Sequence, residues 1–281
     1  MELFLETLHP DFQQGLAVDE VLFEGHTAFQ SARIFSNKTF GKVLTLDGVV
    51  QTTEADEFIY HEMLSHMPLF ALDQPQDVLI IGGGDGGCLE EVLKHPVKSA
   101  TMVELDPGVV DISKQHLRSI CGDAFEDART ELIIGDGAKF VAESERRFDV
   151  VIVDSTDPVG PGEVLFSETF YADCRRCLTE RGVLITQNGV PFLQRAELDK
   201  SVGIFRKLFR HAGFYLAVIP TYAGGFMALG CASNGTDVAN VAPDVLAARY
   251  QSAGFATRYY NPALHRACFA APSFLHDVGA G

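Results

Sequence analysis

From residue 77 onward, short apolar segments alternate with longer amphipathic segments, and this alternation limits the possible folds more than any other feature. The apolar segments have the length of strands, and their continuous apolar character is typical of strands buried on both faces. They lie at 77–82, 99–105, 130–135, 148–154 and 182–187. The segments between them have the periodicity of helices that cover a sheet. The pattern therefore predicts a doubly wound α/β domain with a mostly parallel sheet.

Two more strands are predicted at 214–220 and 226–233, and only the five residues Thr221–Gly225 separate them. This connection is too short for a helical crossover, so the two strands must pair antiparallel. By analogy of fold, a nucleotide-binding sheet that ends in such a hairpin is typical of Rossmann-like domains of the S-adenosylmethionine methyltransferase type.

The segment 12–52 has the apolar clustering of β-structure and contains Asp47-Gly48, a strong signal for a type I′ hairpin turn. We expect a small antiparallel β-sheet domain at 1–53 and a Rossmann-like catalytic domain at 54–281. Thr53 and Asp56 are expected to form a capping box for a helix that stops before Pro68.

The chain has 281 residues and a formal net charge of −16, so its average surface repels nucleic acids and anionic lipids and attracts cations. No apolar run approaches the ~18 residues of a membrane span, and the acidic N-terminus lacks the positive charge of a signal peptide. We therefore expect a cytoplasmic protein without nucleic-acid or membrane partners.

Metal binding is not expected, although two patterns suggest it. Cys174 and Cys177 form a C-x-x-C, but no second pair is present for zinc, and the six cysteines are scattered as free thiols would be. His61 and Glu62 begin an H-E-x-x-H pattern, but His66 comes one residue too late to share a helix face with His61.

A glycine-rich turn follows the first parallel strand, with Gly82, Gly84 and Gly87 in G-x-G-x-x-G spacing. Glu104 ends the next strand, where an acid accepts hydrogen bonds from ribose hydroxyls. Asp85 lies inside the turn, and beside a pyrophosphate it would cost about 4 kcal/mol at an effective dielectric near 20. The turn therefore favours a nucleoside over a dinucleotide.

The other strand ends are acidic as well. Asp136 and Gly137 follow the third strand, where an adenine amino group could bind, and Asp154 and Asp157 follow the fourth. Such residues often cap helices, but no Lys or Arg lies in these turns, and the first and fourth strand ends face each other in this fold. The acids predict a positively charged nucleoside without phosphate, such as decarboxylated S-adenosylmethionine.

Five motifs resemble those of the polyamine aminopropyltransferases, the family of spermidine synthases: VLTLDGVVQTTEADEFIYHEM, LIIGGGDGG, VELD, DSTDPVGPGE and IPTYAGG. The resemblance covers about residues 6 to 275. It implies decarboxylated S-adenosylmethionine as a co-substrate, with no separate cofactor, and putrescine as the typical acceptor. The products would be spermidine and methylthioadenosine, and the assembly a homodimer or higher homo-oligomer.

The resemblance also implies roles for individual residues. Asp154 would accept the proton, Asp157 would bind the acceptor amine, and Asp85 would hold the aminopropyl ammonium. Tyr60 and Tyr222 would border the reacting amine. The other implied substrate-binding residues are Gln30, Gln51, His61, Glu104, Asp136, Gly137, Ser155, Thr156, Pro161 and Gln187. The segment 158–165 contains Pro158, Gly160, Pro161 and Gly162 directly after Asp154 and Asp157, and we expect this loop to close over the substrates.

Other functions remain open at this point. The acceptor could be cadaverine, agmatine or spermidine, and Ala223 after Tyr222 departs from bulkier versions of this loop. A small-molecule methyltransferase on the same fold, a dehydrogenase and a non-catalytic polyamine sensor are the remaining alternatives. Asp85 argues against the dehydrogenase, and the pair Asp154 and Asp157 argues against the sensor.

Overall fold

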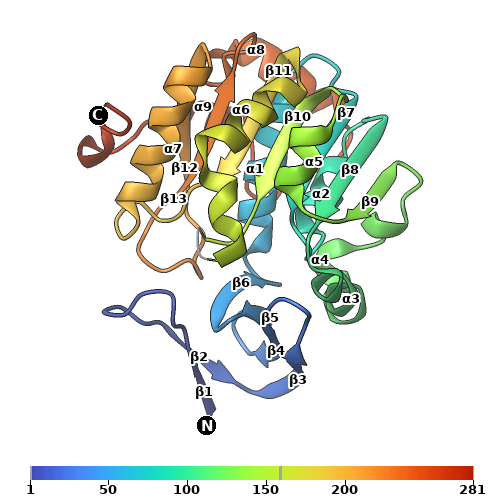
Figure 1. Cartoon of the computed structure of the whole chain (residues 1–281), viewed down its shortest axis with the longest axis vertical. Coiled ribbons are helices and arrows are strands. Elements are labelled where there is room, and N and C mark those ends of the chain that lie inside the picture. The colour runs from blue at the N-terminus through green and yellow to red at the C-terminus, as the bar shows by residue number, and fades with distance from the viewer. Residues whose placement is uncertain (1, 158–159, 281) are drawn as a thin grey trace.

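The computed structural model describes residues 2–157 and 160–280, and its N-terminal part forms a small β unit at one end of the molecule (Figure 1). Two strands pair antiparallel, β1 (Glu2–Leu5) and β2 (Gly15–Val18). Four more form an antiparallel sheet in sequence order: β3 (Glu20–His26), β4 (Ser31–Asn37), β5 (Gly41–Leu46) and β6 (Val49–Thr53). The predicted β unit is confirmed, although β1 was not expected.

The hairpin between β5 and β6 has the predicted turn. Asp47 and Gly48 have φ values of 47° and 78°, and Leu46 pairs with Val49 across the turn. Positive φ at both central residues is the signature of type I′, whose twist matches that of the flanking strands.

A seven-stranded sheet forms the larger unit, in the order β12-β13-β11-β10-β7-β8-β9. The five neighbouring strands β11, β10, β7, β8 and β9 run parallel to one another, whereas β13 pairs antiparallel with both β11 and β12. The strands are β7 (Asp77–Gly82), β8 (Ser99–Glu104), β9 (Thr130–Ile134), β10 (Phe148–Asp154), β11 (Leu178–Gln187), β12 (His211–Ala217) and β13 (Met227–Ser233). The Rossmann-like sheet and its antiparallel hairpin are confirmed.

Helices cover both faces of this sheet (Figure 1). The α-helices are α1 (Glu57–Ala71), α2 (Gly87–Leu93), α3 (Pro107–His116), α4 (Arg118–Cys121), α5 (Gly137–Glu143), α6 (Glu168–Cys177), α7 (Arg195–Leu208), α8 (Pro243–Ser252) and α9 (Pro262–Ala267). The 3-10 turns are η1 (Ala124–Glu126), η2 (Gly160–Phe166), η3 (Val238–Asn240) and η4 (Ser273–Leu275). In the part of the chain that the structure describes, we find no helix with both the length and the apolar character needed to cross a membrane.

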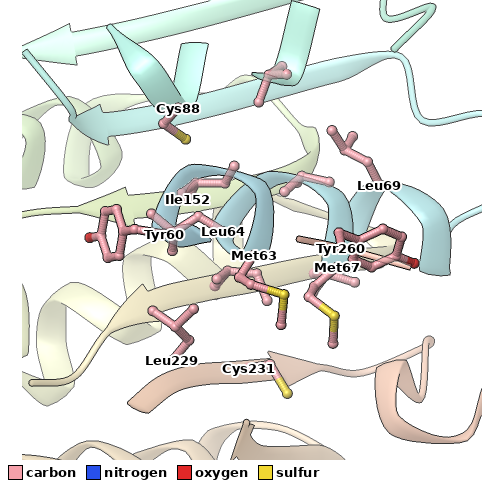
Figure 2. Close-up of a cluster of buried hydrophobic side chains, with 14 of the residues drawn as sticks. Tyr60, Met63, Leu64, Met67, Leu69, Cys88, Ile152, Leu229, Cys231 and Tyr260 are labelled. Carbon is pink, nitrogen blue, oxygen red and sulfur yellow. The ribbon is translucent and has the colours of Figure 1, made fainter. Parts of the chain in front are cut away.

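Alternate residues of each central strand enter two different cores. In β7, Val78 and Ile80 pack with α1 and α2, whereas Leu79 and Ile81 pack with α5, α6 and α7. Figure 2 shows Met63, Leu64 and Met67 of α1 within the first core, with Tyr60 at the end of the same helix. The continuous apolar strands are therefore explained by burial on both sides.

The predicted ends of α1 are wrong. Asp56 is the N-cap residue but makes no side-chain cap, because its carboxylate accepts hydrogen bonds from Thr53 Oγ1 and from Thr221. The helix also continues through Pro68 to Ala71. The last turn buries Leu69 and Phe70 in the core, and this burial offsets the backbone hydrogen bond that proline cannot make.

Candidate active site

A cavity of about 610 Å³ lies at the carboxyl ends of β7, β8 and β10, and residues of β5 and β6 line its other side. Its walls include most of the predicted site residues. They are Gln30, Gln51, Tyr60, Gly82, Gly84, Asp85, Glu104, Asp136, Gly137, Asp154, Ser155, Thr156, Asp157 and Tyr222. A smaller cavity of about 60 Å³ shares Tyr60, Asp157 and Tyr222 and adds Gln187.

The glycine turn brings the ends of β7 and β10 into contact. Gly82 has a φ of 82°, and a Cβ atom at this position would overlap the carbonyl oxygen of Asp154. The amide of Gly83 donates a hydrogen bond of 2.9 Å to the same oxygen. Because β7 and β10 are neighbours in the sheet, the glycines allow Asp85 and Asp154 to line the same cavity. This is the arrangement predicted for the switch point of this fold.

Asp154 has one oxygen that is held and one that is free. Tyr60 Oη donates a hydrogen bond of 2.8 Å to Oδ1, whereas Oδ2 is buried and has no hydrogen-bond partner among the described residues. Burial, and then the negative charge of Asp85, raise the pKa of Asp154 to about 6, although His61 and Tyr60 oppose the shift. An orphaned carboxylate oxygen in a cavity wall is suited to accept a proton or a cationic ligand.

Asp85 has a cationic neighbour that the sequence pattern did not reveal. His61 lies between Glu57 and Asp85, with Nδ1 2.8 Å from Glu57 Oε2 and Nε2 3.4 Å from Asp85 Oδ1. Burial lowers the pKa of His61, but the two carboxylates outweigh it and leave the pKa well above its usual value. No Lys or Arg pairs with Asp85, Asp154 or Asp157 in the described chain, but His61 partly neutralises Asp85.

His61 itself does not line either cavity, in contrast to its predicted place beside the polyamine. Its ring instead occupies the space next to Gly87, where a Cβ atom would overlap it. Gly87 is also absent from the cavity walls, and its amide donates a hydrogen bond of 2.8 Å to Asp85 Oδ1. Both residues therefore contact Asp85 from outside the cavity.

Glu104 is a buried acid at the end of β8 in the wall of the larger cavity. Burial raises its pKa to about 7, although a hydrogen bond of 2.8 Å from the amide of Asp106 to Oε1 opposes the shift. Asp106 caps α3 and accepts a hydrogen bond of 3.0 Å from Gln30 Nε2, which links the β unit to the larger sheet. Asp106 was missed, although an Asp before the Pro that opens a helix is a recognisable cap signal.

Asp136 is the N-cap residue of α5, which is the structural role that an acid after a strand often has. Its Oδ1 accepts hydrogen bonds from the amides of Ala138 and Lys139 at the start of α5. Gly137 packs against Ile81, and a Cβ atom here would overlap that side chain. Both residues line the cavity, so capping and contact with a ligand are compatible.

The far end of the site is built around Asp157 and Tyr222. Gln194 Nε2 donates a hydrogen bond of 2.6 Å to Asp157 Oδ1, and Gln187 Nε2 donates one of 3.2 Å to the carbonyl of Ser155. Tyr222 Oη donates to the carbonyl of Gln51 at 2.5 Å. The rings of Tyr222 and Tyr60 pack edge to face, with 5.7 Å between their centroids. Both rings line the cavity that also contains Asp154 and Asp157.

Three polar side chains of the small cavity were not predicted: Glu6, His9 and Gln194. They come from the N-terminal segment and from the residue before α7. No local motif marks them, because only the tertiary fold brings these segments together.

Pro158 and Pro161 belong to the predicted closing loop. Pro158 lies outside the described residues, and for Pro161 only the backbone, within η2, is described. Gly162, Val164 and Leu165, which follow them, line the larger cavity.

The two metal-like patterns have other structural roles. Cys174 and Cys177 are buried free cysteines of α6, and burial raises the pKa of both thiols. The carboxylate of Glu62 accepts hydrogen bonds from the amides of 258–260. Over residues 2–157 and 160–280, no group of three His, Cys, Asp or Glu side chains could hold a metal ion.

Comparison with family models gives two matches that together span most of the chain. Residues 57–241 match the spermine/spermidine synthase domain, and residues 3–54 match the spermidine synthase tetramerisation domain.

Curated relatives are similar over nearly their whole length. The polyamine aminopropyltransferase of Ruegeria sp. (strain TM1040) is 54% identical over 274 residues, which cover 97% of this chain and 96% of that protein. The polyamine aminopropyltransferase of Klebsiella pneumoniae (strain 342) is 50% identical over 280 residues, with 98% and 97% covered.

Two solved structures share the fold. A spermidine synthase in complex with the transition state analogue AdoDATO superposes with a TM-score of 0.94 at 36% identity, covering 99% of this chain and 95% of that one. The spermidine synthase of Thermotoga maritima gives a TM-score of 0.91 at 34% identity, with 99% and 94% covered.

Proposed function

The chain belongs to the spermine/spermidine synthase family and is an aminopropyltransferase, and from this premise we propose that it makes spermidine. It would transfer the aminopropyl group of decarboxylated S-adenosylmethionine to putrescine and release methylthioadenosine. The observation that carries the proposal is the orphaned Oδ2 of Asp154, which is buried near Asp85 in the wall of the larger cavity.

The donor is proposed to occupy the larger cavity. Glu104 would accept hydrogen bonds from the ribose hydroxyls, and Asp136 and Gly137 would border the adenine. Asp85 would hold the ammonium of the aminopropyl group. A carboxylated donor would bring a negative charge towards Asp85 and Asp154, so the decarboxylated form is favoured.

The acceptor is proposed to enter from the side of the small cavity, with its reacting amine between Tyr60 and Tyr222 and Asp157 binding its ammonium. An alkyl amine with a pKa near ~10.4 is neutral in only about one molecule in a thousand at pH 7. A base must therefore remove its proton before it can attack.

Asp154 is proposed as this base. The hydrogen bond from Tyr60 fixes Oδ1 and leaves Oδ2 for the amine proton. With a pKa of about 6, Asp154 is ionised at neutral pH and can accept a proton more readily than an ordinary aspartate. Placed general bases contribute roughly 10²- to 10⁴-fold to the rate.

The proposed step balances without a further reactant. The amine nitrogen forms a bond to the methylene carbon next to sulfur, and the carbon–sulfur bond breaks with its electron pair going to sulfur. The proton of the amine passes to Asp154. The products are spermidine and neutral methylthioadenosine.

The test is to incubate the protein with decarboxylated S-adenosylmethionine and, in separate reactions at one concentration, putrescine, cadaverine, agmatine or spermidine. Methylthioadenosine release and product masses are then measured. We expect spermidine to form fastest, and no methylated product with the carboxylated donor. Preferential consumption of another amine would refute putrescine as the acceptor while leaving the aminopropyl transfer intact.

The assembly and the location are further proposals. The match of residues 3–54 to a tetramerisation domain supports a homo-oligomer, and we propose residues 1–53 as its assembly unit and 54–281 as the catalytic unit. Light scattering of the purified chain would distinguish a dimer from a tetramer. Cytoplasmic location stays a prediction, to be tested by fractionation.

A further inference from the structure

Gln194 is an unusual residue for its place in the fold. It is the N-cap residue of α7, where Ser, Thr, Asp or Asn normally accepts a hydrogen bond from the first turn, yet its side chain makes no such cap. It is 9% exposed. A buried glutamine that does not stabilise its own helix is expected to have another partner.

That partner is Asp157. The distance from Gln194 Nε2 to Asp157 Oδ1 is 2.6 Å. The other end of the amide is also fixed, because Oε1 accepts a hydrogen bond of 2.8 Å from the amide of Val190. Since only the oxygen can accept from Val190, the NH₂ group must face Asp157.

The backbone closes onto this amide as well. Gly189 has a φ of 69°, and a Cβ atom there would lie 2.6 Å from Gln194 Oε1. Gln194 is therefore held by a close loop on one side and by the start of α7 on the other. Asp157, by contrast, lies in a segment without regular secondary structure after β10, and Gln194 is the side chain that donates to its carboxylate at 2.6 Å.

The same hydrogen bond affects the charge of Asp157. Burial raises the pKa of this carboxyl, and three groups lower it again: first the donor from Gln194, then the charge of His9 and a hydrogen bond from Gln187. Without the donor, Asp157 would keep its proton to a higher pH and would attract an ammonium group less strongly at neutral pH.

We propose that Gln194 is the positioning residue for Asp157: its amide holds Oδ1, so that Oδ2 is left to bind the acceptor ammonium. The inference rests on the proposed function, in which Asp157 binds the acceptor. Gln194 touches neither the donor side of the cavity nor Asp154, and it lines only the small cavity. Its effect is therefore confined to the acceptor.

Two variants separate this role from simple support of the loop at 187–190. Gln194→Met has a similar length but no donor and no acceptor. Gln194→Glu keeps an oxygen for the amide of Val190 but loses the donor to Asp157. Gln251→Met, on the exposed surface of α8, is the matched control.

The experiment measures KM for putrescine, KM for decarboxylated S-adenosylmethionine and kcat between pH 6 and pH 9, from methylthioadenosine release. In Gln194→Met, we expect KM for putrescine to rise about tenfold, because a hydrogen bond to a charged group is lost. KM for the donor should change less than about twofold. The acidic limb of kcat/KM for putrescine should move to higher pH by about one unit.

In Gln194→Glu, KM for putrescine should change with pH in a way that neither wild type nor Gln194→Met shows. The reason is that the introduced carboxyl and the adjacent carboxyl of Asp157 would share a proton. If Gln194 only supports the loop, Gln194→Glu will keep the wild-type KM for putrescine at every pH. That result would overturn the proposal. The proposal would also be overturned if both KM values rise equally in Gln194→Met and the acidic limb of kcat/KM for putrescine does not move. If Gln194→Met does not fold, Gln194→Glu decides by the same criteria.

The wild-type reaction tests which amine is the acceptor, whereas the ratio of variant to wild-type KM tests the role of Gln194. Absence of spermidine from the wild-type reaction refutes the proposed acceptor, whereas Gln194 is judged only by the ratio of variant to wild type. If wild type prefers another diamine, the same ratios are measured with that diamine.

Discussion

Glu104 and Asp154 are both buried acids of the cavity wall, but they differ in what their raised pKa values imply. Asp154, with a pKa of about 6, is ionised at neutral pH, as a base must be. Glu104, with a pKa of about 7, is only about half ionised there. Binding of the nucleoside is therefore expected to depend on pH.

In the proposed donor site, the ionised form of Glu104 is the one that can accept hydrogen bonds from both ribose hydroxyls. Its population falls as pH falls through the pKa, so the affinity for methylthioadenosine should fall in the same direction. Between pH 8 and pH 6 we expect the apparent Kd to rise about tenfold, in proportion to the lost ionised fraction. Calorimetric titration across this range measures it.

Glu104→Gln is the control for this pH dependence. The variant should bind methylthioadenosine more weakly than wild type at pH 8, with a Kd that changes little between pH 6 and pH 8. An unchanged pH dependence in Glu104→Gln would assign the titration to another group.

At the residue scale, the sequence pattern predicted which acids meet but not what contacts them. Asp85, Asp154 and Asp157 follow strand ends, and strand ends can be read from where an apolar run stops. His61 beside Asp85 and Gln194 beside Asp157 could not be predicted. Each pair joins segments far apart in the chain, and their contacts depend on packing.

At the scale of elements, the turn after β7 determines the geometry of the site. Gly82 is required both by its positive φ and by the close approach of the Asp154 backbone. A side chain at this position would push β7 and β10 apart at the point where their acids converge.

Gly82→Ala is expected to lower the free energy of unfolding by more than about 2 kcal/mol, because it adds left-handed strain to a backbone clash. Gly203→Ala in α7 is the matched control. A Cβ atom there meets nothing within 4 Å, so it should be neutral or stabilise by up to about 1 kcal/mol. Urea unfolding of both variants measures the difference, and equal stabilities would contradict this role for Gly82.

Most elements of the larger unit could be predicted because each has a clear period and a clear end. The end of α1 could not, because the core contacts of Leu69 and Phe70 outweigh the signal of Pro68. Strand β1 was missed because its sequence carries too weak a pattern. It is short and mostly exposed, so it carries little apolar pattern.

At the scale of the whole molecule, the site is completed by both units. Residues of β5 and β6 line the larger cavity, and Tyr222 is held through the carbonyl of Gln51. Gln14, also from the N-terminal unit, donates a hydrogen bond to the carbonyl of Thr221, the residue before Tyr222. The N-terminal unit therefore fixes the wall against which the acceptor amine is proposed to lie.

The net charge of −16 provides a field that attracts cationic substrates. Raising the ionic strength from about 0.05 to about 0.5 M should increase KM for putrescine, because salt screens the attraction of a dication. The Kd of methylthioadenosine, which is neutral, should stay nearly constant and serves as the internal control. An equal response of both ligands would exclude a long-range electrostatic effect.

The most direct test concerns the proton that the acceptor must lose. Single-turnover release of methylthioadenosine is measured for wild type and Asp154→Asn, together with the Kd of methylthioadenosine for each. We predict that the variant loses about 10²- to 10⁴-fold in rate while its Kd changes less than about twofold. A variant that turns over at nearly the wild-type rate would contradict the role of Asp154 as the base.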